Sequence, residues 1–73
     1  MRTLDHLERH QTATVCGLTE GPFADALAEA GVAPGAEVEV LARGLFGGTP
    51  LSVRVGRAVL ALRKAEAAAV VLA

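Results

Sequence analysis

The spacing of hydrophobic residues changes along the chain, and each spacing predicts a different secondary structure. Apolar and polar residues alternate in segments 11–18, 37–43 and 51–55, which is typical of β-strands with one buried face. In residues 22–30 the apolar residues recur at helical spacing instead. The pattern therefore predicts a mainly β chain with a short helix after its first strand.

Glycine and proline residues mark where these elements end. Gly31 directly follows the predicted helix, where a left-handed residue closes many helices. Pro34-Gly35 has the residue order of a type II turn. Gly56-Arg57 has glycine first, as a type II′ hairpin requires, and so predicts a partner strand over 58–62. The segment 44–50 is rich in glycine and predicts a loop.

Both ends of the chain carry further short elements. Thr3 can cap a helical turn in which Leu4 and Leu7 share one face. Residues 63–69 are rich in alanine and predict a second short helix, and residues 70–72 predict a final strand. Five short strands cannot bury a common face as a flat sheet at this size. We therefore expect a single domain over the whole chain, folded as a small five-stranded β-barrel with short helices.

The composition excludes several classes of function. Seven Lys and Arg residues against eight Asp and Glu residues give a net charge of −1, so the basic surface of a nucleic-acid-binding protein is missing. The absence of Trp and Tyr excludes an aromatic platform for single strands. A single Cys, no signal peptide and no apolar run long enough to insert into a membrane predict a cytoplasmic domain.

His6, His10 and Cys16 are the candidate metal ligands. His6 and His10 are four positions apart, so a continuous helix would place both imidazoles on one face, and Cys16 lies on the next predicted strand. Imidazole nitrogen is a suitable ligand for Fe²⁺. The alternative is that both histidines lie on the surface and Cys16 packs as a small apolar residue. We favour the alternative, because the helical turn is expected to end before His10.

A catalytic function is not expected. Cys16 with one of the two histidines is the only nucleophile and base pair that the composition permits. Gly47-Gly48-Thr49 lacks the lysine and the helix that a phosphate-binding loop needs. No residue is therefore assigned a catalytic role.

Acidic and basic residues are separated along the chain. Residues 20–39 contain five acidic and no basic side chains, whereas residues 43–64 contain five basic and no acidic ones. This separation could orient the domain on a partner of complementary charge, with Arg54 and Arg57 as contacts. The alternative, which we favour, is that folding pairs the two groups, with Glu37 and Glu39 facing Arg54 across neighbouring strands.

Two segments are candidate contact surfaces for a protein partner. Leu45 and Phe46 are large apolar residues within the glycine-rich segment 44–50. They either anchor a partner or plug one end of the barrel, and the sequence favours neither interpretation. The second candidate is the helix over 22–30, where Phe23 and Asp25 are the expected contacts.

Three motifs support a family resemblance that extends over nearly the whole chain. The helix and the turn after it carry Leu27-x-x-x-Gly31-Val32-x-Pro34-Gly35-x-x-Val38-x-Val40. The later strands and helix carry Gly48-x-Pro50-Leu51-x-Val53-x-Val55 and Ala61-Leu62-Arg63-x-x-Glu66-Ala67. This combination resembles the FeoA family, the small cytosolic components of bacterial ferrous-iron transport.

The resemblance implies a fold, a function and a partner. The fold is an SH3-like β-barrel. The function is that of a non-enzymatic accessory protein that binds a membrane ferrous-iron transporter with a cytosolic G domain (FeoB-like). The alternative hypothesis is a small protein that binds or delivers Fe²⁺ through His6, His10 and Cys16. A barrel recruited to some other partner also remains open.

Overall fold

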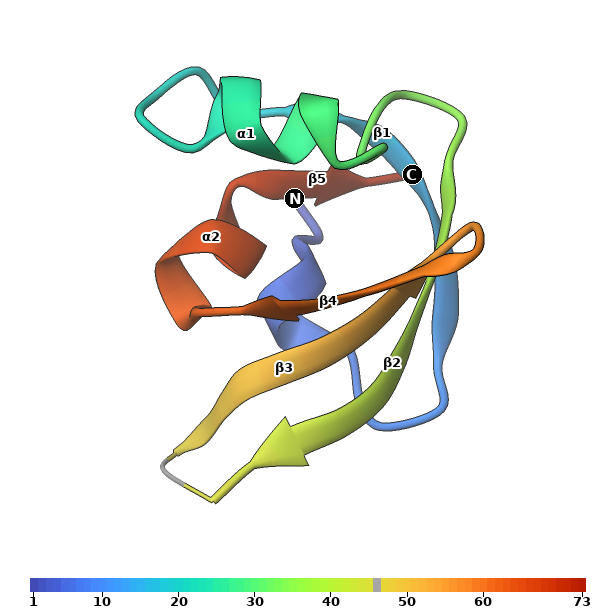
Figure 1. Ribbon diagram of the computed structural model, residues 1–73, viewed down its shortest axis with the longest axis vertical. Coiled ribbons are helices and arrows are strands. Elements are labelled where there is room, and N and C mark those ends of the chain that lie inside the picture. Colours follow the sequence, from blue (N-terminus) through green and yellow to red (C-terminus); the bar gives the residue numbers. More distant parts are fainter. Residues whose placement is uncertain (46) are drawn as a thin grey trace.

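The order of elements along the chain follows the predicted one. The computed structural model describes residues 1–45 and 47–73 (Figure 1). Its elements are a 3₁₀ helix η1 (Leu4–His6), β1 (Thr12–Leu18), α1 (Ala24–Glu29), β2 (Glu37–Gly44), β3 (Gly48–Val55), β4 (Ala58–Leu62), α2 (Lys64–Ala68) and β5 (Val70–Leu72). No helix among the described residues is long and apolar enough to cross a membrane.

The five strands form one antiparallel sheet in the order β4-β3-β2-β1-β5. Among the described residues no strand pairing joins β4 to β5, so the predicted closure of the barrel is wrong. The physical reason is the helix α2, which lies between these two strands in the chain and packs against η1 (Figure 1). Helical elements therefore fill the side of the barrel at which a fifth strand pairing, between β4 and β5, would have closed the sheet.

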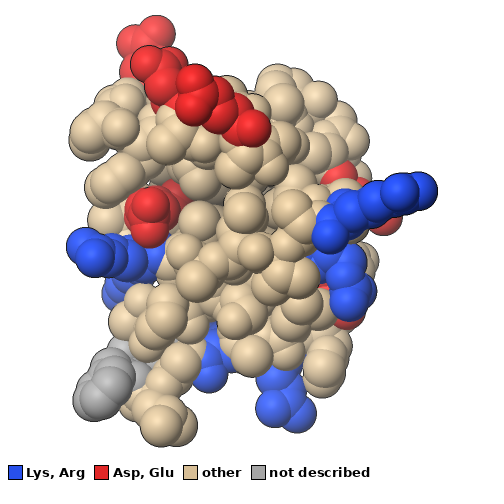
Figure 2. Space-filling view, viewed as in Figure 1, with Lys and Arg blue, Asp and Glu red and all other residues tan. Residues whose placement is uncertain are grey.

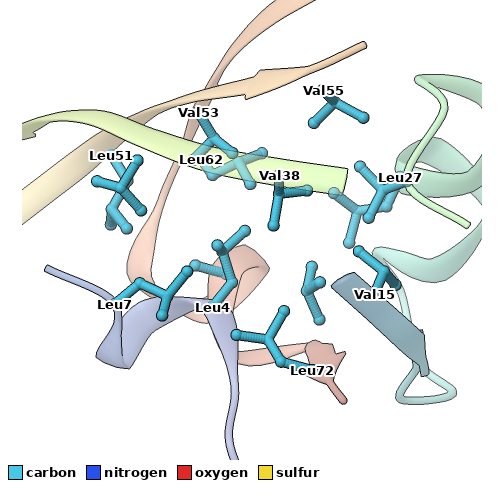
Figure 3. Packing of buried hydrophobic residues seen from close by; sticks show 14 residues of the cluster. Leu4, Leu7, Val15, Leu27, Val38, Leu51, Val53, Val55, Leu62 and Leu72 are labelled. Carbon is cyan, nitrogen blue, oxygen red and sulfur yellow. The ribbon is translucent and has the colours of Figure 1, made fainter. Parts of the chain in front are cut away.

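Side chains from every element meet in one hydrophobic core (Figure 3). The apolar residues at the predicted inward positions of the alternating segments are buried, except that Ala13 is partly buried, and Leu4 and Leu7 of the N-terminal turn pack with them (Figure 3). The core consists of Leu4, Leu7, Val15, Leu27, Val32, Val38, Val40, Leu51, Val53, Val55, Leu62, Ala67, Val70 and Leu72. Alternation in the sequence thus correctly identified which face of each long strand is buried.

The helix α1 ends as the sequence predicts, although it is shorter than residues 22–30. Gly31 has a φ of 99°, and its N–H donates to the carbonyl of Ala28 at 3.0 Å. The N–H of Val32 donates to the carbonyl of Leu27 at 2.9 Å. These two bonds form a Schellman motif, which places Val32 in the core directly after the helix.

The loop predicted over 44–50 is wrong in its extent. The strand β2 continues to Gly44 and β3 already begins at Gly48, and these two glycines are paired. A Cβ atom at Gly44 would overlap the backbone carbonyl of Thr49, so only glycine allows the two strands to approach so closely. Gly44 is required here for the close approach of two paired strands. The glycine content of a segment does not distinguish this role from that of a loop.

Candidate functional site

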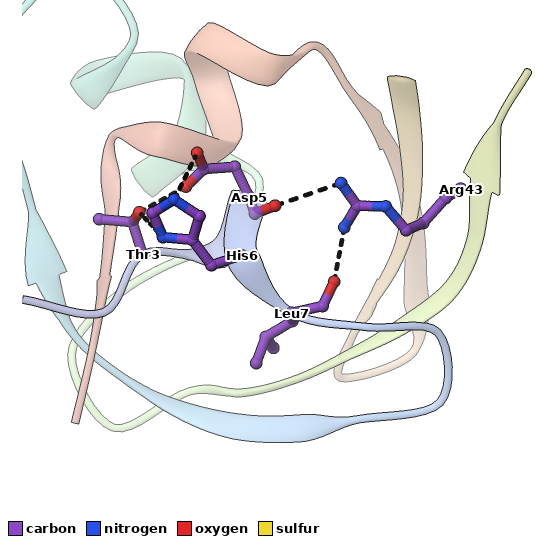
Figure 4. A network of polar contacts seen from close by, with 5 residues as sticks. All are labelled: Thr3, Asp5, His6, Leu7 and Arg43. Carbon is purple, nitrogen blue, oxygen red and sulfur yellow. Dashed lines mark hydrogen bonds and ion pairs between the residues drawn. The ribbon is translucent and has the colours of Figure 1, made fainter. Parts of the chain in front are cut away.

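A polar network holds the N-terminal turn in place (Figure 4). The carboxylate of Asp5, whose side chain is only 7% exposed, accepts a hydrogen bond from the hydroxyl of Thr3. The imidazole of His6 lies 3.7 Å from the same carboxylate and 3.3 Å from the Thr3 hydroxyl. Thr3 was expected to cap the backbone of this turn, but its hydroxyl bonds a side chain instead.

Arg43 joins this network from the far end of β2. Its guanidinium donates to the carbonyl of Leu7 at 2.5 Å and to the carbonyl of Asp5 at 3.2 Å (Figure 4). Carbonyls at the end of a helix lack partners within the helix, and a cation is favourable there. Arg43 therefore closes the C-terminal end of η1. Its role in this network is structural.

The three predicted metal ligands are not brought together. The 3₁₀ helix ends at His6, and the chain reaches His10 in a left-handed conformation with a φ of 73°. His6, His10 and Cys16 are all exposed. Within residues 1–45 and 47–73 no group of three or more His, Cys, Asp or Glu side chains is placed to hold a metal ion. The spacing of four residues between His6 and His10 does not indicate a shared metal site in this fold, because the two residues do not lie on one continuous helix.

One predicted charge pairing is confirmed. Glu39 lies opposite Arg54 in the β2–β3 ladder, and their side chains form an ion pair at 3.0 Å. Glu37 instead lies opposite Thr14 of β1. Arg57 is exposed in the β3–β4 hairpin. Folding thus pairs part of the acidic segment with the basic one, while Figure 2 shows that other acidic side chains gather along one end of the molecule.

A shallow groove separates the start of α1 from α2. It has a volume of about 230 Å³ and is lined by Thr19, Glu20, Gly21, Pro22, Phe23, Ala65, Ala68 and Ala69. Phe23 is half-buried at its wall, and Asp25 is exposed on the helix that follows. The sequence indicated Phe23 but not the alanine wall of α2, because alanines in a helix carry no signal of their own.

Leu45 and Phe46, the candidate contacts in the segment 44–50, have to be considered separately. Leu45 is 96% exposed, so the interpretation that it plugs the barrel is wrong. Phe46 lies outside the described residues. The exposed Leu45 is compatible with a contact role, which remains a prediction.

Comparison with known proteins identifies the family. The model of the FeoA domain matches residues 2–73. The chain belongs to the FeoA family. Membership makes it an accessory protein of ferrous-iron transport, as the motifs around Gly31 and Arg63 indicated. No curated protein sequence is significantly similar to this FeoA domain.

Solved structures of similar proteins confirm the fold. FeoA of Stenotrophomonas maltophilia in complex with zinc, described as an SH3 domain protein, superposes with a TM-score of 0.91 at 38% identity, covering 100% of this chain and 91% of that one. FeoA of Chlorobium tepidum gives a TM-score of 0.83 at 26% identity, covering 97% and 68%. A manganese-dependent transcriptional repressor gives 0.85 at 25% identity, with 99% of this chain and 41% of that one covered. The fold is therefore SH3-like and mainly β, as predicted.

Proposed function

We propose that this FeoA domain acts in the cytoplasm as a non-enzymatic adaptor that binds the cytosolic G domain of a ferrous-iron transporter. Family membership over residues 2–73 is the observation that carries the proposal. The relative from Stenotrophomonas maltophilia is described as a candidate activating factor of ferrous-iron transport. An activating factor that catalyses no reaction itself would act by binding its partner.

The groove between α1 and α2 is the contact surface that the geometry favours. Its wall combines the half-buried ring of Phe23 with the exposed Ala65 and Ala68 of α2. Aromatic side chains in partly enclosed positions contribute strongly to protein interfaces, and small alanines leave room for an apolar side chain of the partner. Arg54, Arg57, Asp25 and Leu45 are exposed to different degrees around the domain and would contribute to the orientation of the complex rather than to its core.

The alternative hypothesis, delivery of Fe²⁺ by His6, His10 and Cys16, receives no support from this geometry. Three ligands on separate, exposed positions would each need to move before one ion could contact them all.

Titration of the labelled domain with the purified G domain of the cognate transporter tests the proposal by NMR. We expect shifts at Phe23 and along α2, and we expect Ala65→Glu to weaken binding about tenfold or more by placing a charge in the groove. Position 65 lies in the first turn of α2, where a negative charge does not destabilise the helix.

Ala26→Glu provides the matched control for this variant. It adds the same charge to the first turn of α1 at an exposed position outside the groove, and it should leave binding unchanged. Absence of binding at any accessible concentration would refute the adaptor function. Equal losses from both variants would instead show that the groove is not the contact surface.

A further inference from the structure

The two edge strands of the sheet, β4 and β5, differ in whether another segment of the chain covers their outer side. At one end, β5 is bordered by the N-terminal segment: Thr3 forms an isolated bridge with Val71, and the N–H of Leu72 donates to the carbonyl of Arg2 at 2.9 Å. At the other end lies β4, which pairs with β3 on one side. Among the described residues no backbone hydrogen bond reaches its other side.

The register of the hairpin shows which backbone groups of β4 are available. Val55 and Ala58 flank the two-residue turn and form its closing pair, so Ala58, Leu60 and Leu62 direct their backbone groups toward β3. Val59 and Ala61 alternate with these residues, so each of the two directs both its N–H and its C=O away from β3 and toward solvent. We call these four groups the free edge of β4.

The free edge lacks the features that usually prevent strand addition. Sheet edges are commonly protected by charged side chains, proline or a bulge. The strand Ala58–Leu62 contains no charge and no proline, and its register with β3 is unbroken, whereas the β1–β5 and β2–β3 ladders both contain shifts. Val59 is 60% exposed and Ala61 is exposed. An extended peptide could therefore continue the ladder.

Charges at the two ends of β4 indicate the chemistry of that peptide. Arg57 precedes the strand, and Arg63 and Lys64 follow it, all three being exposed. Glu66 bonds the backbone N–H of Arg63 at 2.8 Å, and the α2 end is net positive even with this carboxylate counted. Figure 2 shows basic side chains at the left and right of a broad uncharged surface, in the view in which β4 crosses the front of the molecule (Figure 1).

These charges also argue against a second copy of the chain as the occupant. Antiparallel pairing of two β4 strands would place Arg57 of each copy beside Arg63 and Lys64 of the other. Like charges opposed across strands are unfavourable. A peptide that is apolar at its centre and acidic at both ends suits the edge in either direction.

We propose that the free edge of β4 binds an extended segment of another protein, apolar in its middle and acidic at both ends, by adding it as a sixth strand. The proposal goes beyond the adaptor function and does not depend on the α1–α2 groove. Main-chain bonds to Val59 and Ala61 would provide the affinity, and Arg57, Arg63 and Lys64 the preference for acidic ends.

Titration of the labelled domain with a synthetic heptapeptide, acetyl-Glu-Thr-Val-Thr-Val-Thr-Glu-amide, tests this proposal by NMR. We expect shifts at the amides of Val59 and Ala61, and binding about tenfold weaker for the peptide with lysine in place of both glutamates. A peptide N-methylated at the amides that face the strand should not bind, because it cannot donate. This control leaves the protein unchanged, so folding of a variant does not affect it.

Protein variants give an independent measurement. Val59→Pro removes an outward N–H without removing a bond to β3, so it should abolish binding, whereas Val59→Thr retains the N–H and should bind normally. Arg57→Glu combined with Arg63→Glu should invert the preference to the lysine peptide. Failure of the glutamate peptide to bind, equal binding of both peptides, or shifts confined to other strands would overturn the proposal. Concentration-dependent shifts of Val59 and Ala61 without peptide would overturn it in favour of a second copy.

Discussion

Replacement of Arg43 by alanine tests whether one side chain fixes the N-terminal turn in the fold. The guanidinium donates to two carbonyls, those of Leu7 and Asp5, which are remote in sequence from β2. A hydrogen bond from a charged donor contributes roughly 1.5–3 kcal/mol to stability. Against this, release of the arginine side chain recovers up to about 2 kcal/mol of conformational entropy. We therefore expect a loss of about 2–3 kcal/mol in the free energy of unfolding.

This loss is large relative to the stability of a domain of 73 residues, which is on the order of 4–11 kcal/mol. Urea unfolding followed by circular dichroism measures it, and the midpoint of thermal unfolding should fall by roughly 10–20 °C. Hydrogen exchange should accelerate at the amide of Leu7, which donates to Leu4 within the same turn. The loss should depend little on salt, since the acceptors are neutral carbonyls.

Two further variants serve as comparisons. One separates the geometry of the Arg43 side chain from its charge, and the other removes an exposed arginine elsewhere in the domain. Arg43→Lys keeps the charge but cannot bond two carbonyls as a planar fork does, so about half of the stability loss should remain. Arg57→Ala removes an exposed arginine from the hairpin and should change stability by less than about 0.5 kcal/mol. The reasoning is refuted if Arg43→Ala is as stable as the parent protein, or if Arg43→Lys is indistinguishable from it.

Two smaller effects follow from the strand pairings. Gly44→Ala should destabilise the domain by about 1–3 kcal/mol in urea unfolding because its Cβ would overlap the facing strand, whereas Gly17→Ala, where the space is open, should be nearly neutral; equal effects would contradict the close approach. Glu39→Gln should cost about 0.2–1 kcal/mol at low salt and less at high salt, because its partner Arg54 is half exposed, and Glu37→Gln, opposite a threonine, should show no such salt dependence.

Local patterns in the sequence were sufficient to predict most of the fold. Alternation identified the strands and their buried faces, and Gly31 with Val32 identified the end of α1, because each signal is carried by neighbouring residues. The segment 44–50 was misjudged, since glycine permits both a turn and a close strand pairing. The role of Arg43 could not be predicted at all, because its partners lie 36 and 38 positions away.

The candidate site was less predictable for a related reason. Phe23 was indicated because it belongs to the amphipathic helix predicted over 22–30, which was a candidate contact surface. The alanines that form the opposite wall of the groove were not indicated, since Ala65 and Ala68 gain significance only from the position of α2 beside α1. His6 and His10 illustrate the converse case, in which a spacing pattern has no counterpart in the fold. Their spacing suggested a site, but a single 3₁₀ turn cannot align them.

A single feature, the helix between β4 and β5, accounts for the departure from a closed barrel and for both proposed surfaces. Consecutive antiparallel strands joined by a tight turn pair with each other, as β3 and β4 do across Gly56-Arg57. Had residues 63–69 been such a turn, β4 would pair with β5 and the free edge would not exist. The same change would remove Ala65 and Ala68 from beside Phe23, and with them one wall of the groove. Both proposed surfaces therefore depend on the open side of this SH3-like sheet, next to α2.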